Sequence, residues 1–290
     1  MSLPIERIYI PTVRRHDRQI TFNSLPEELR QRVIMVVEPA ERHLYQYDCD
    51  YLELPDEIVG SWTQLAQTRL LIHKHAGPIR YCVTDDDLTI KRRNSKYWTG
   101  RSNMETSSRN ATPDEILTAF DTFSTWLDEI NIGIVGLSRQ QSPPAKTEYV
   151  DTVGAFSILF IDGRMVAPEI DDMDITQIRV SEDVLFLFEC LSRGINTRLS
   201  TEWTYDNGSF KADMQASRVV WTEMFEEQPE NYFESDEHIK ACEYIQAKFP
   251  HAMTVYEKYG KHKNTKHWKK IYRPSVRHMN RYLEEQRSSA

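Results

Sequence analysis

Glycine is scarce in this sequence, at 10 of 290 residues, which is roughly half of average usage. Neither G-x-x-x-x-G-K-[ST] nor G-x-G-x-x-G occurs, which excludes a P-loop and the simplest Rossmann dinucleotide signature. Long apolar runs are also lacking, since stretches such as 184–188 are short and broken by charge. We therefore expect no segment that spans a bilayer. A signal peptide is not expected either, because Glu6, Arg7 and Pro11 interrupt the N-terminal region.

Cysteine is rare as well, and Cys49, Cys82, Cys190 and Cys242 lie far apart with no C-x-x-C pair. A zinc ribbon and a disulfide framework are therefore poor interpretations, and free thiols in a reducing cytoplasm fit better. We expect a cytoplasmic protein, in the host cytoplasm if the chain is phage-encoded. Hydrophobic residues make up 40% and charged residues 28%, which is ordinary for a globular chain with a sizeable core and excludes disorder.

The charge is unevenly distributed along the chain. The net charge is −8, which argues against a protein that coats nucleic acid along its whole surface. Between Lys258 and Arg281, however, there are nine Lys or Arg residues and no acid. Tyr259, Trp268 and Tyr272 are interleaved with them. This asymmetry indicates a local polyanion site on an acidic body, with a solvated basic C-terminal helix as the structural alternative.

Strand-like and helix-like patterns alternate over much of the chain. We expect strands around 8–13, 33–37, 79–84, 132–137 and 155–161. Three helices are expected to start at Ser61 (capping box with Gln64), at Thr112 (capping box with Glu115) and at Ser181. Such alternation predicts an α/β sheet that is largely parallel, with ligands at the carboxyl ends of its strands.

Three aspartates, Asp85-Asp86-Asp87, directly follow the third expected strand. Consecutive carboxylates beside an apolar strand are unfavourable unless a cation neutralises them. Asp85 and Asp87 can both point toward one hard divalent ion, which binds oxygen ligands and bridges to substrate phosphates. A solvated turn or an N-cap cluster is the structural alternative, but Leu88-Thr89-Ile90 look extended. We interpret the triplet as a metal–phosphate site.

Two further segments carry possible chemistry. Arg14, Arg15 and Arg18 follow the first strand, where a guanidinium group suits nucleotide phosphates. Ser181-Glu182-Asp183 opens a helix, where acids are favoured by the helix dipole and capping is the default explanation. A catalytic base could occupy the same place, since a carboxylate there lies beside a pocket.

In this order, the three segments resemble the GT-A class of nucleotide-sugar glycosyltransferases. A more specific similarity is carried by the N-terminal string. It consists of Ile8-Tyr9-Ile10-Pro11-Thr12 with Arg15, Arg18-Gln19, Thr21 and Leu25-Pro26. This string resembles the N-terminus of the TET/JBP-associated glycosyltransferases, a family that includes the base J glucosyltransferase and phage enzymes that glycosylate hydroxymethylated pyrimidines in DNA. The similarity covers about Arg7 to Asp87 and resumes at Ser181-Glu182-Asp183.

The resemblance implies a GT-A-like, Rossmann-type mixed sheet flanked by helices, with a basic C-terminal helical segment. It also implies Mn²⁺ or Mg²⁺ held by Asp85 and Asp87 against the diphosphate of a UDP-sugar, with His262 as a candidate metal ligand. Asp183, or Glu182, would accept the proton of the acceptor hydroxyl in a single displacement. The residues implied for the nucleotide-sugar pocket are Pro11, Thr12, Arg14, Arg15, Arg18, Arg69 and Asp86.

With such an activity, the basic segment would bind double-stranded DNA with hydroxymethylated bases as the acceptor. It would contact phosphates and stack on a base that has left the duplex. The residues assigned to DNA are Lys261, Lys263, Lys266, Trp268, Lys269, Lys270 and Arg273. We expect a catalytic domain over 1–257, with a nucleotide-sugar half (1–95) and an acceptor half (96–257), followed by the basic segment 258–290.

The sequence thus predicts a nucleotide-sugar-dependent hexosyltransferase with a DNA acceptor. One alternative is a nucleotidyltransferase or pyrophosphorylase that uses the same carboxylates on a sugar phosphate. Such proteins usually carry a glycine-rich loop after the first strand, and glycine is absent from that loop here. A second alternative is a non-catalytic DNA-binding or structural protein, which would leave the aspartate cluster behind an apolar strand without a reason.

Overall fold

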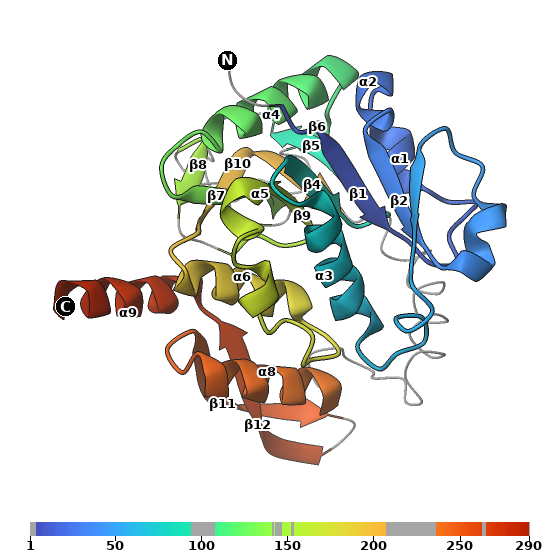
Figure 1. Ribbon diagram of the computed structural model, residues 1–290. Coiled ribbons are helices and arrows are strands. Elements are labelled where there is room, and N and C mark those ends of the chain that lie inside the picture. The colour runs from blue at the N-terminus through green and yellow to red at the C-terminus, as the bar shows by residue number, and fades with distance from the viewer. Residues whose placement is uncertain are drawn as a thin grey trace.

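The structure, a computed structural model, describes residues 4–93, 108–140, 142, 147–151, 154–206, 236–262 and 265–289. Most of the strands form one ten-stranded sheet (Figure 1). Its strands are β1 (Arg7–Pro11), β2 (Val33–Val37), β3 (Asp50–Glu53), β4 (Arg80–Thr84), β5 (Thr89–Arg93), β6 (Ser108–Asn110), β7 (Ile132–Arg139), β8 (Tyr149–Asp151), β9 (Ile158–Asp162) and β10 (Asn196–Asp206).

The strand order is β3-β2-β1-β4-β9-β7-β10-β5-β6, with β8 paired to β10. The first four strands are parallel neighbours, and β7 is parallel to β10. Because β9 is antiparallel to both β4 and β7, β7 and β10 run in the same direction as β1 and β4. The expectation of a mixed, mostly parallel α/β sheet is therefore confirmed. The carboxyl ends of β1, β2, β4, β7 and β10 lie toward the same edge.

Helices cover both faces of this sheet. Alternate side chains of a strand enter opposite core clusters, so that Ile8 and Ile10 pack on one face and Tyr9 on the other. The first face is covered by α1 (Ile20–Ser24), α2 (Glu27–Arg30) and α4 (Pro113–Trp126), and the second by α3 (Gln64–Ala76), α5 (Gly163–Val166), α6 (Glu182–Ser192) and α8 (Asp236–Lys248). Two 3₁₀ helices, η1 (Pro39–Leu44) and η3 (Ile170–Asp172), lie in the connections.

The two predicted capping boxes have different outcomes. The box before α4 is confirmed, since Glu115 N donates to Thr112 Oγ1 at 3.4 Å and Thr112 N to the Glu115 carboxylate at 2.9 Å. The box at Ser61 is wrong, because α3 begins at Gln64 itself. The Gln64 side chain instead accepts from Gly60 N and donates to Glu38, both at 2.6 Å. The contact with Glu38, which follows β2, therefore takes the place of the predicted capping contact between Gln64 and Ser61.

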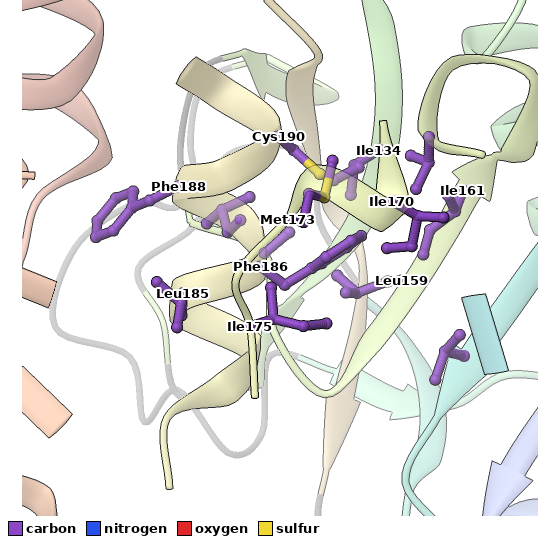
Figure 2. Close-up of a cluster of buried hydrophobic side chains, with 14 of the residues drawn as sticks. Ile134, Leu159, Ile161, Ile170, Met173, Ile175, Leu185, Phe186, Phe188 and Cys190 are labelled. Carbon is purple, nitrogen blue, oxygen red and sulfur yellow. The ribbon is translucent and has the colours of Figure 1, made fainter. Parts of the chain in front are cut away.

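Helix α6 lies between the sheet and α8. Figure 2 shows Phe186 and Cys190 pointing from α6 toward the strands, near Leu159 and Ile134, while Phe188 points to the opposite side. There the Phe188 ring meets that of Phe249, just after α8, with the ring centroids 6.0 Å apart. Burial of a Leu or Phe side chain stabilises a fold by about 1.5–3 kcal/mol, so packing on both sides fixes the position of α6 and of its N-terminal acids.

The basic C-terminal segment corrects one expectation. It contains an antiparallel hairpin, β11 (Met253–His262) with β12 (Thr265–Pro274), where we expected a helix. Helical structure is confirmed only in α9 (Val276–Ser289), and the expected domain boundary at 257/258 falls inside β11. Figure 1 shows the hairpin beside α8, apart from the main sheet. Among the described residues, no helix has the length and apolarity that a membrane crossing requires.

Candidate functional site

The loops after β1 and β4 meet as the sequence predicts. The two strands are parallel neighbours, with Tyr9 paired to Val83, so Thr12 and the aspartate triplet leave the same edge of the sheet. Thr21 on α1 holds the triplet's backbone, because its hydroxyl donates to Asp85 O at 2.6 Å and accepts from Leu88 N at 2.8 Å. The sequence-predicted grouping of these two loops is confirmed.

Asp86 is the most buried aspartate of the triplet, with 7% of its surface exposed. Its carboxylate accepts from Thr12 Oγ1 and from Arg15 Nη1, both at 2.6 Å. Burial raises the pKa of Asp86 to about 6, although Arg15 acts in the opposite direction. Asp86 therefore ties the loop after β1 to the loop after β4, which is consistent with the pocket-lining role expected for it and for Thr12.

Asp85 and Asp87 are more accessible and each lies beside an arginine. Arg69 Nη2 donates to Asp85 Oδ1 at 2.8 Å, and Arg15 Nη1 lies 3.2 Å from Asp87 Oδ2. Within the described part of the chain, no three His, Cys, Asp or Glu side chains gather as a metal site. Magnesium needs fewer protein ligands than this, since one or two carboxylates together with substrate phosphates are enough to bind it. The two partly exposed carboxylates fit Mg²⁺ or Mn²⁺ on that basis, and the metal stays a prediction.

Arg69 links the triplet to the acids of α6. It is 9% exposed, and its Nε lies 3.6 Å from Glu182 Oε1. This Nε is buried without a hydrogen-bond partner in the described residues. Burial lowers the pKa of Arg69, but Asp85 and Glu182 outweigh that effect and the net shift is upward. The guanidinium stays charged and joins the carboxylates of Asp85 and Glu182, which lie 97 residues apart in sequence.

Glu182 and Asp183 begin α6. Glu182 is 5% exposed, whereas Asp183 is half-buried and accepts from Val184 N at 2.8 Å. Burial raises the pKa of both carboxyl groups; Asp183 raises that of Glu182 further, and Arg69 opposes both shifts. Ser181, the N-cap residue, makes no side-chain capping bond. Asp183 instead bonds a first-turn N–H, which is the structural role expected for an acid at a helix start. The raised pKa values of both acids also fit a group that exchanges protons.

A small cavity separates these acids from the sheet. Its volume is about 10 Å³, which is close to the space for one water molecule. The lining residues are Arg69, His73, Val83, Leu159, Glu182, Asp183 and Phe186. The His73 ring stacks on Phe186 with the centroids 4.2 Å apart, and burial lowers the pKa of His73 to about 3. A packed, neutral imidazole therefore lines this cavity.

Three residues around the site have left-handed backbone conformations. They are Arg14 (φ 55°), Ser157 (φ 64°) and Ser181 (φ 64°). Ser157 O accepts from Asp85 N at 3.0 Å, so the strained carbonyl positions the triplet directly. Such conformations are unfavourable by about 1–3 kcal/mol for a non-glycine residue and are often found at functional sites. A fourth such residue, Asn131 (φ 70°), precedes β7 at the opposite end of that strand, so left-handed conformations are not confined to this edge of the sheet.

The remaining predicted pocket residues divide into two groups. Pro11 ends β1 beside Thr12, and Arg15 lies inside the site through its bonds to the triplet. Arg14 and Arg18 are exposed; Arg14 N donates to Glu41 at 2.7 Å, and Arg18 Nε lies 3.8 Å from Asp17. A nucleotide-binding role for Arg14 and Arg18 remains a prediction.

Sequence reasoning missed several residues of the site. Tyr45 accepts from Arg15 N at 3.3 Å, and Gln19 donates to Thr12 Oγ1 at 2.7 Å. Arg139 ends β7 and donates to Tyr205 at 3.0 Å. Burial lowers the pKa of Arg139, but Tyr205 and the carboxylates of Asp183 and Asp85 raise it overall. Arg139 was detectable, because it is the first charge after a buried strand that shares the direction of β4.

A contact from α8 also reaches the N-terminus of α6. His238 is 6% exposed, and its Nδ1 lies 3.3 Å from Ser181 Oγ while its Nε2 lies 3.4 Å from Cys242 Sγ. Burial lowers the pKa of His238. No sequence signal pairs these residues, which are distant in the chain. The element that precedes the basic hairpin thus touches the residue next to the two acids.

The residues assigned to DNA and the C-terminal metal ligand lie on the hairpin. His262 is the last residue of β11 and pairs with Thr265. Lys263 lies outside the described residues, and for the others the structure describes the backbone. Those are Lys261 on β11 and Lys266, Trp268, Lys269, Lys270 and Arg273 on β12. Their assignment to DNA, and that of His262 to a metal, remain predictions.

No protein-family model and no curated protein matches this sequence. Two solved structures are similar to it in overall shape. UTP-bound UGPase from Acinetobacter baumannii is 10% identical with a TM-score of 0.37, over 83% of this chain and 98% of that chain. UDP-glucose pyrophosphorylase from the same organism is 9% identical with a TM-score of 0.38, over 84% and 99%. Identities and TM-scores this low define neither a family nor an activity.

Proposed function

We propose that this chain is a metal-dependent glycosyltransferase that moves the sugar of a UDP-sugar onto a hydroxymethylated pyrimidine in DNA. The observation that carries the proposal is the Glu182–Asp183 pair. Both carboxyl groups have raised pKa values because of burial, and Arg69 connects Glu182 to Asp85 of the aspartate triplet. A proton acceptor beside a diphosphate site is what transfer of a sugar to a hydroxyl requires.

On the donor side, the proposal uses Asp85, Asp87 and Arg15. Mn²⁺ or Mg²⁺, when bound, stabilises the charge that develops on a departing diphosphate. Asp85 and Asp87 would hold that ion, and Arg15 offers a guanidinium that matches phosphate oxygens. Arg15 is itself positioned by Asp86 at 2.6 Å and by Tyr45 through its backbone N–H. A fixed guanidinium loses less conformational freedom when the phosphate binds.

On the acceptor side, Asp183 takes the proton of the hydroxyl as its oxygen bonds to the anomeric carbon. The bond between that carbon and the diphosphate oxygen breaks, and UDP leaves with the electron pair. Asp183 is the more exposed of the two acids and therefore the one that can reach an acceptor. Glu182 lies buried beside Arg69, and the charge of Asp183 raises the pKa of Glu182. A single displacement of this kind inverts the anomeric configuration.

A second candidate is nucleotidyl transfer from UTP to a sugar phosphate. It is favoured by Arg69 and Arg139, two guanidinium groups that interact with Asp85 and Asp183. A phosphate nucleophile is already anionic at neutral pH, so it needs cations rather than a base. We prefer sugar transfer to nucleotidyl transfer because sugar transfer gives Glu182 and Asp183 a role.

Product analysis separates the two candidates. The protein would be incubated with Mn²⁺, a panel of UDP-sugars and hydroxymethylated DNA, and the released nucleosides weighed by mass spectrometry. We expect a nucleoside heavier by one sugar, together with free UDP. Pyrophosphate produced from UTP and a sugar 1-phosphate, with no modified nucleoside, would instead identify the nucleotidyltransferase. Neither product would contradict both.

Replacing Arg69 with Gln should change the pH dependence of turnover. Arg69 lowers the pKa of Glu182 and of Asp183, so the loss of Arg69 raises both pKa values. A catalytic base must be ionised, and the base would then become protonated, and the rate would fall, at a higher pH than in the unmodified protein. We expect the acidic limb of the pH–rate profile to move upward by roughly 1–3 units, the usual effect of an arginine beside a carboxylate. Steady-state rates between pH 5 and 9 measure this.

The matched control is Arg109→Gln, which removes an arginine that pairs with Glu115 on α4. Its acidic limb should coincide with that of the unmodified protein. An acidic limb that stays in place in Arg69→Gln would show that neither α6 carboxylate controls the rate.

A further inference from the structure

A groove on the C-terminal part of the molecule is separate from the site described above. Its volume is about 470 Å³, within the range of ligand-binding pockets. One wall is the turn after α8 and the start of β11, and the other is α9. The lining residues are Pro250, His251, Met253, Thr254, Val255, His278, Arg281, Tyr282 and Glu285. Most of these lining side chains are polar or aromatic, so the groove is suited to a polar ligand.

The aromatic part of the groove is a stacked pair of rings. The His251 and Tyr282 rings lie 3.9 Å apart at their centroids, with 11° between their planes. Next to them, Thr254 Oγ1 and His278 Nδ1 are 3.2 Å apart. A prearranged flat π surface on the outside of a protein can stack on a nucleic-acid base of any sequence. Because His251 and Tyr282 come from different elements, the fold builds this surface.

The charged part of the groove is Arg281, which is exposed on α9. A guanidinium group in this position suits a phosphodiester, to which it can donate two parallel hydrogen bonds. Glu285, one helical turn further along α9, also lines the groove, so Arg281 is accompanied by an acid. A ligand with a single phosphate beside a flat ring matches that arrangement.

The groove is continuous with the basic hairpin. Thr254 and Val255 belong to β11, which continues to Lys258 and Lys261. The hairpin register pairs Lys258 with Lys269 and Lys261 with Lys266. One strand thus leads from the groove to a run of paired lysines.

We propose that this groove binds a DNA strand, with a phosphate on Arg281 and an unpaired base stacked on the His251–Tyr282 pair. The inference deepens the proposed function, since it rests on DNA as the acceptor, and it assigns a contact to residues outside the catalytic edge of the sheet. The strand would continue from the groove along the hairpin. The groove would hold DNA and take no part in the chemistry.

The test is fluorescence anisotropy with a labelled single-stranded oligonucleotide, titrated at several salt concentrations. Tyr282→Ala should weaken binding by roughly 5- to 100-fold, as expected for loss of one stacked base. Arg281→Glu should weaken binding and reduce the log–log salt slope by about one unit, because one phosphate contact is lost. Thermal melting of each variant checks that the fold is retained.

Arg287→Glu is the matched control, since it reverses the same charge on α9 at a residue that does not line the groove. Its salt slope should equal that of the unmodified protein. Equal losses in Arg281→Glu and Arg287→Glu would show that only net charge matters, and unchanged binding in Tyr282→Ala would remove the stacking surface. Either result overturns the proposal.

Hydrolysis of the UDP-sugar without DNA distinguishes this proposal from the proposed function. Both groove variants should hydrolyse the donor at the unmodified rate, because the groove does not touch the aspartate triplet. If the unmodified protein lacks donor turnover, the glycosyltransferase proposal fails, while the oligonucleotide titration still decides the role of the groove.

Discussion

Asp85→Asn should reduce turnover of the UDP-sugar by roughly a thousandfold, because a bound divalent ion supplies several kcal/mol of transition-state stabilisation and about 1.4 kcal/mol corresponds to a factor of ten. The substitution keeps the size of the side chain and removes the charge that would hold the ion. Asp85 is one-third exposed but pairs with the buried Arg69, so a melting curve of the variant separates a loss of stability from a loss of turnover. Donor hydrolysis with varied Mn²⁺ concentrations measures the effect.

The matched control for Asp85 is Asp128→Asn. Asp128 also pairs with an arginine, since Arg80 Nη2 lies 2.6 Å from Asp128 Oδ1. Arg80 is the first residue of β4, however, whereas the aspartate triplet follows the last residue of that strand. We expect near-normal turnover in this variant. Asp85→Asn with full activity, or with activity that persists in EDTA, would remove the metal from the mechanism.

Asp183→Asn should lower the rate of sugar transfer to DNA by roughly 10²- to 10⁴-fold, which is the contribution of a general base. Asn keeps the size of Asp and can still accept the hydrogen bond from Val184 N. It cannot take up the proton of the hydroxyl. Single-turnover rates with saturating UDP-sugar, together with a melting curve, separate catalysis from stability.

Asp114→Asn provides the control for a first-turn acid, because Asp114 occupies the first turn of α4 as Asp183 does in α6. It should melt and react like the unmodified protein. Turnover of Asp183→Asn near the unmodified level would return Asp183 to a structural role and move the search for the base to Glu182.

The sequence predicted that the loops after β1 and β4 meet at one edge of the sheet because the relevant signals are local. Buried strands followed at once by polar residues identify strand ends, and parallel neighbours bring those ends together. The triplet was found in this way, whereas the resemblance to the glycosyltransferases implied Thr12. The capping box at Thr112 and the helix after Ser181 are also encoded by a few adjacent residues.

The parts that sequence reasoning missed depend on contacts between distant residues. Gln64 bonds to Glu38 instead of completing a box with Ser61, and His238 reaches Ser181 across 57 residues. The basic segment was expected to be helical, and its hairpin was missed. The backbone pairing of β11 with β12, such as Tyr259 opposite Trp268, cannot be recognised within a single segment.

The most direct measurement is calorimetric titration of UDP into the unmodified protein, with Mn²⁺ and then with EDTA. If Asp85 and Asp87 hold a divalent ion against the diphosphate, UDP binds in Mn²⁺, loses most of its affinity in EDTA, and binds weakly to Asp85→Asn under both conditions. Equal affinity in Mn²⁺ and EDTA, unchanged in Asp85→Asn, would contradict a metal–nucleotide site at the ends of β1 and β4.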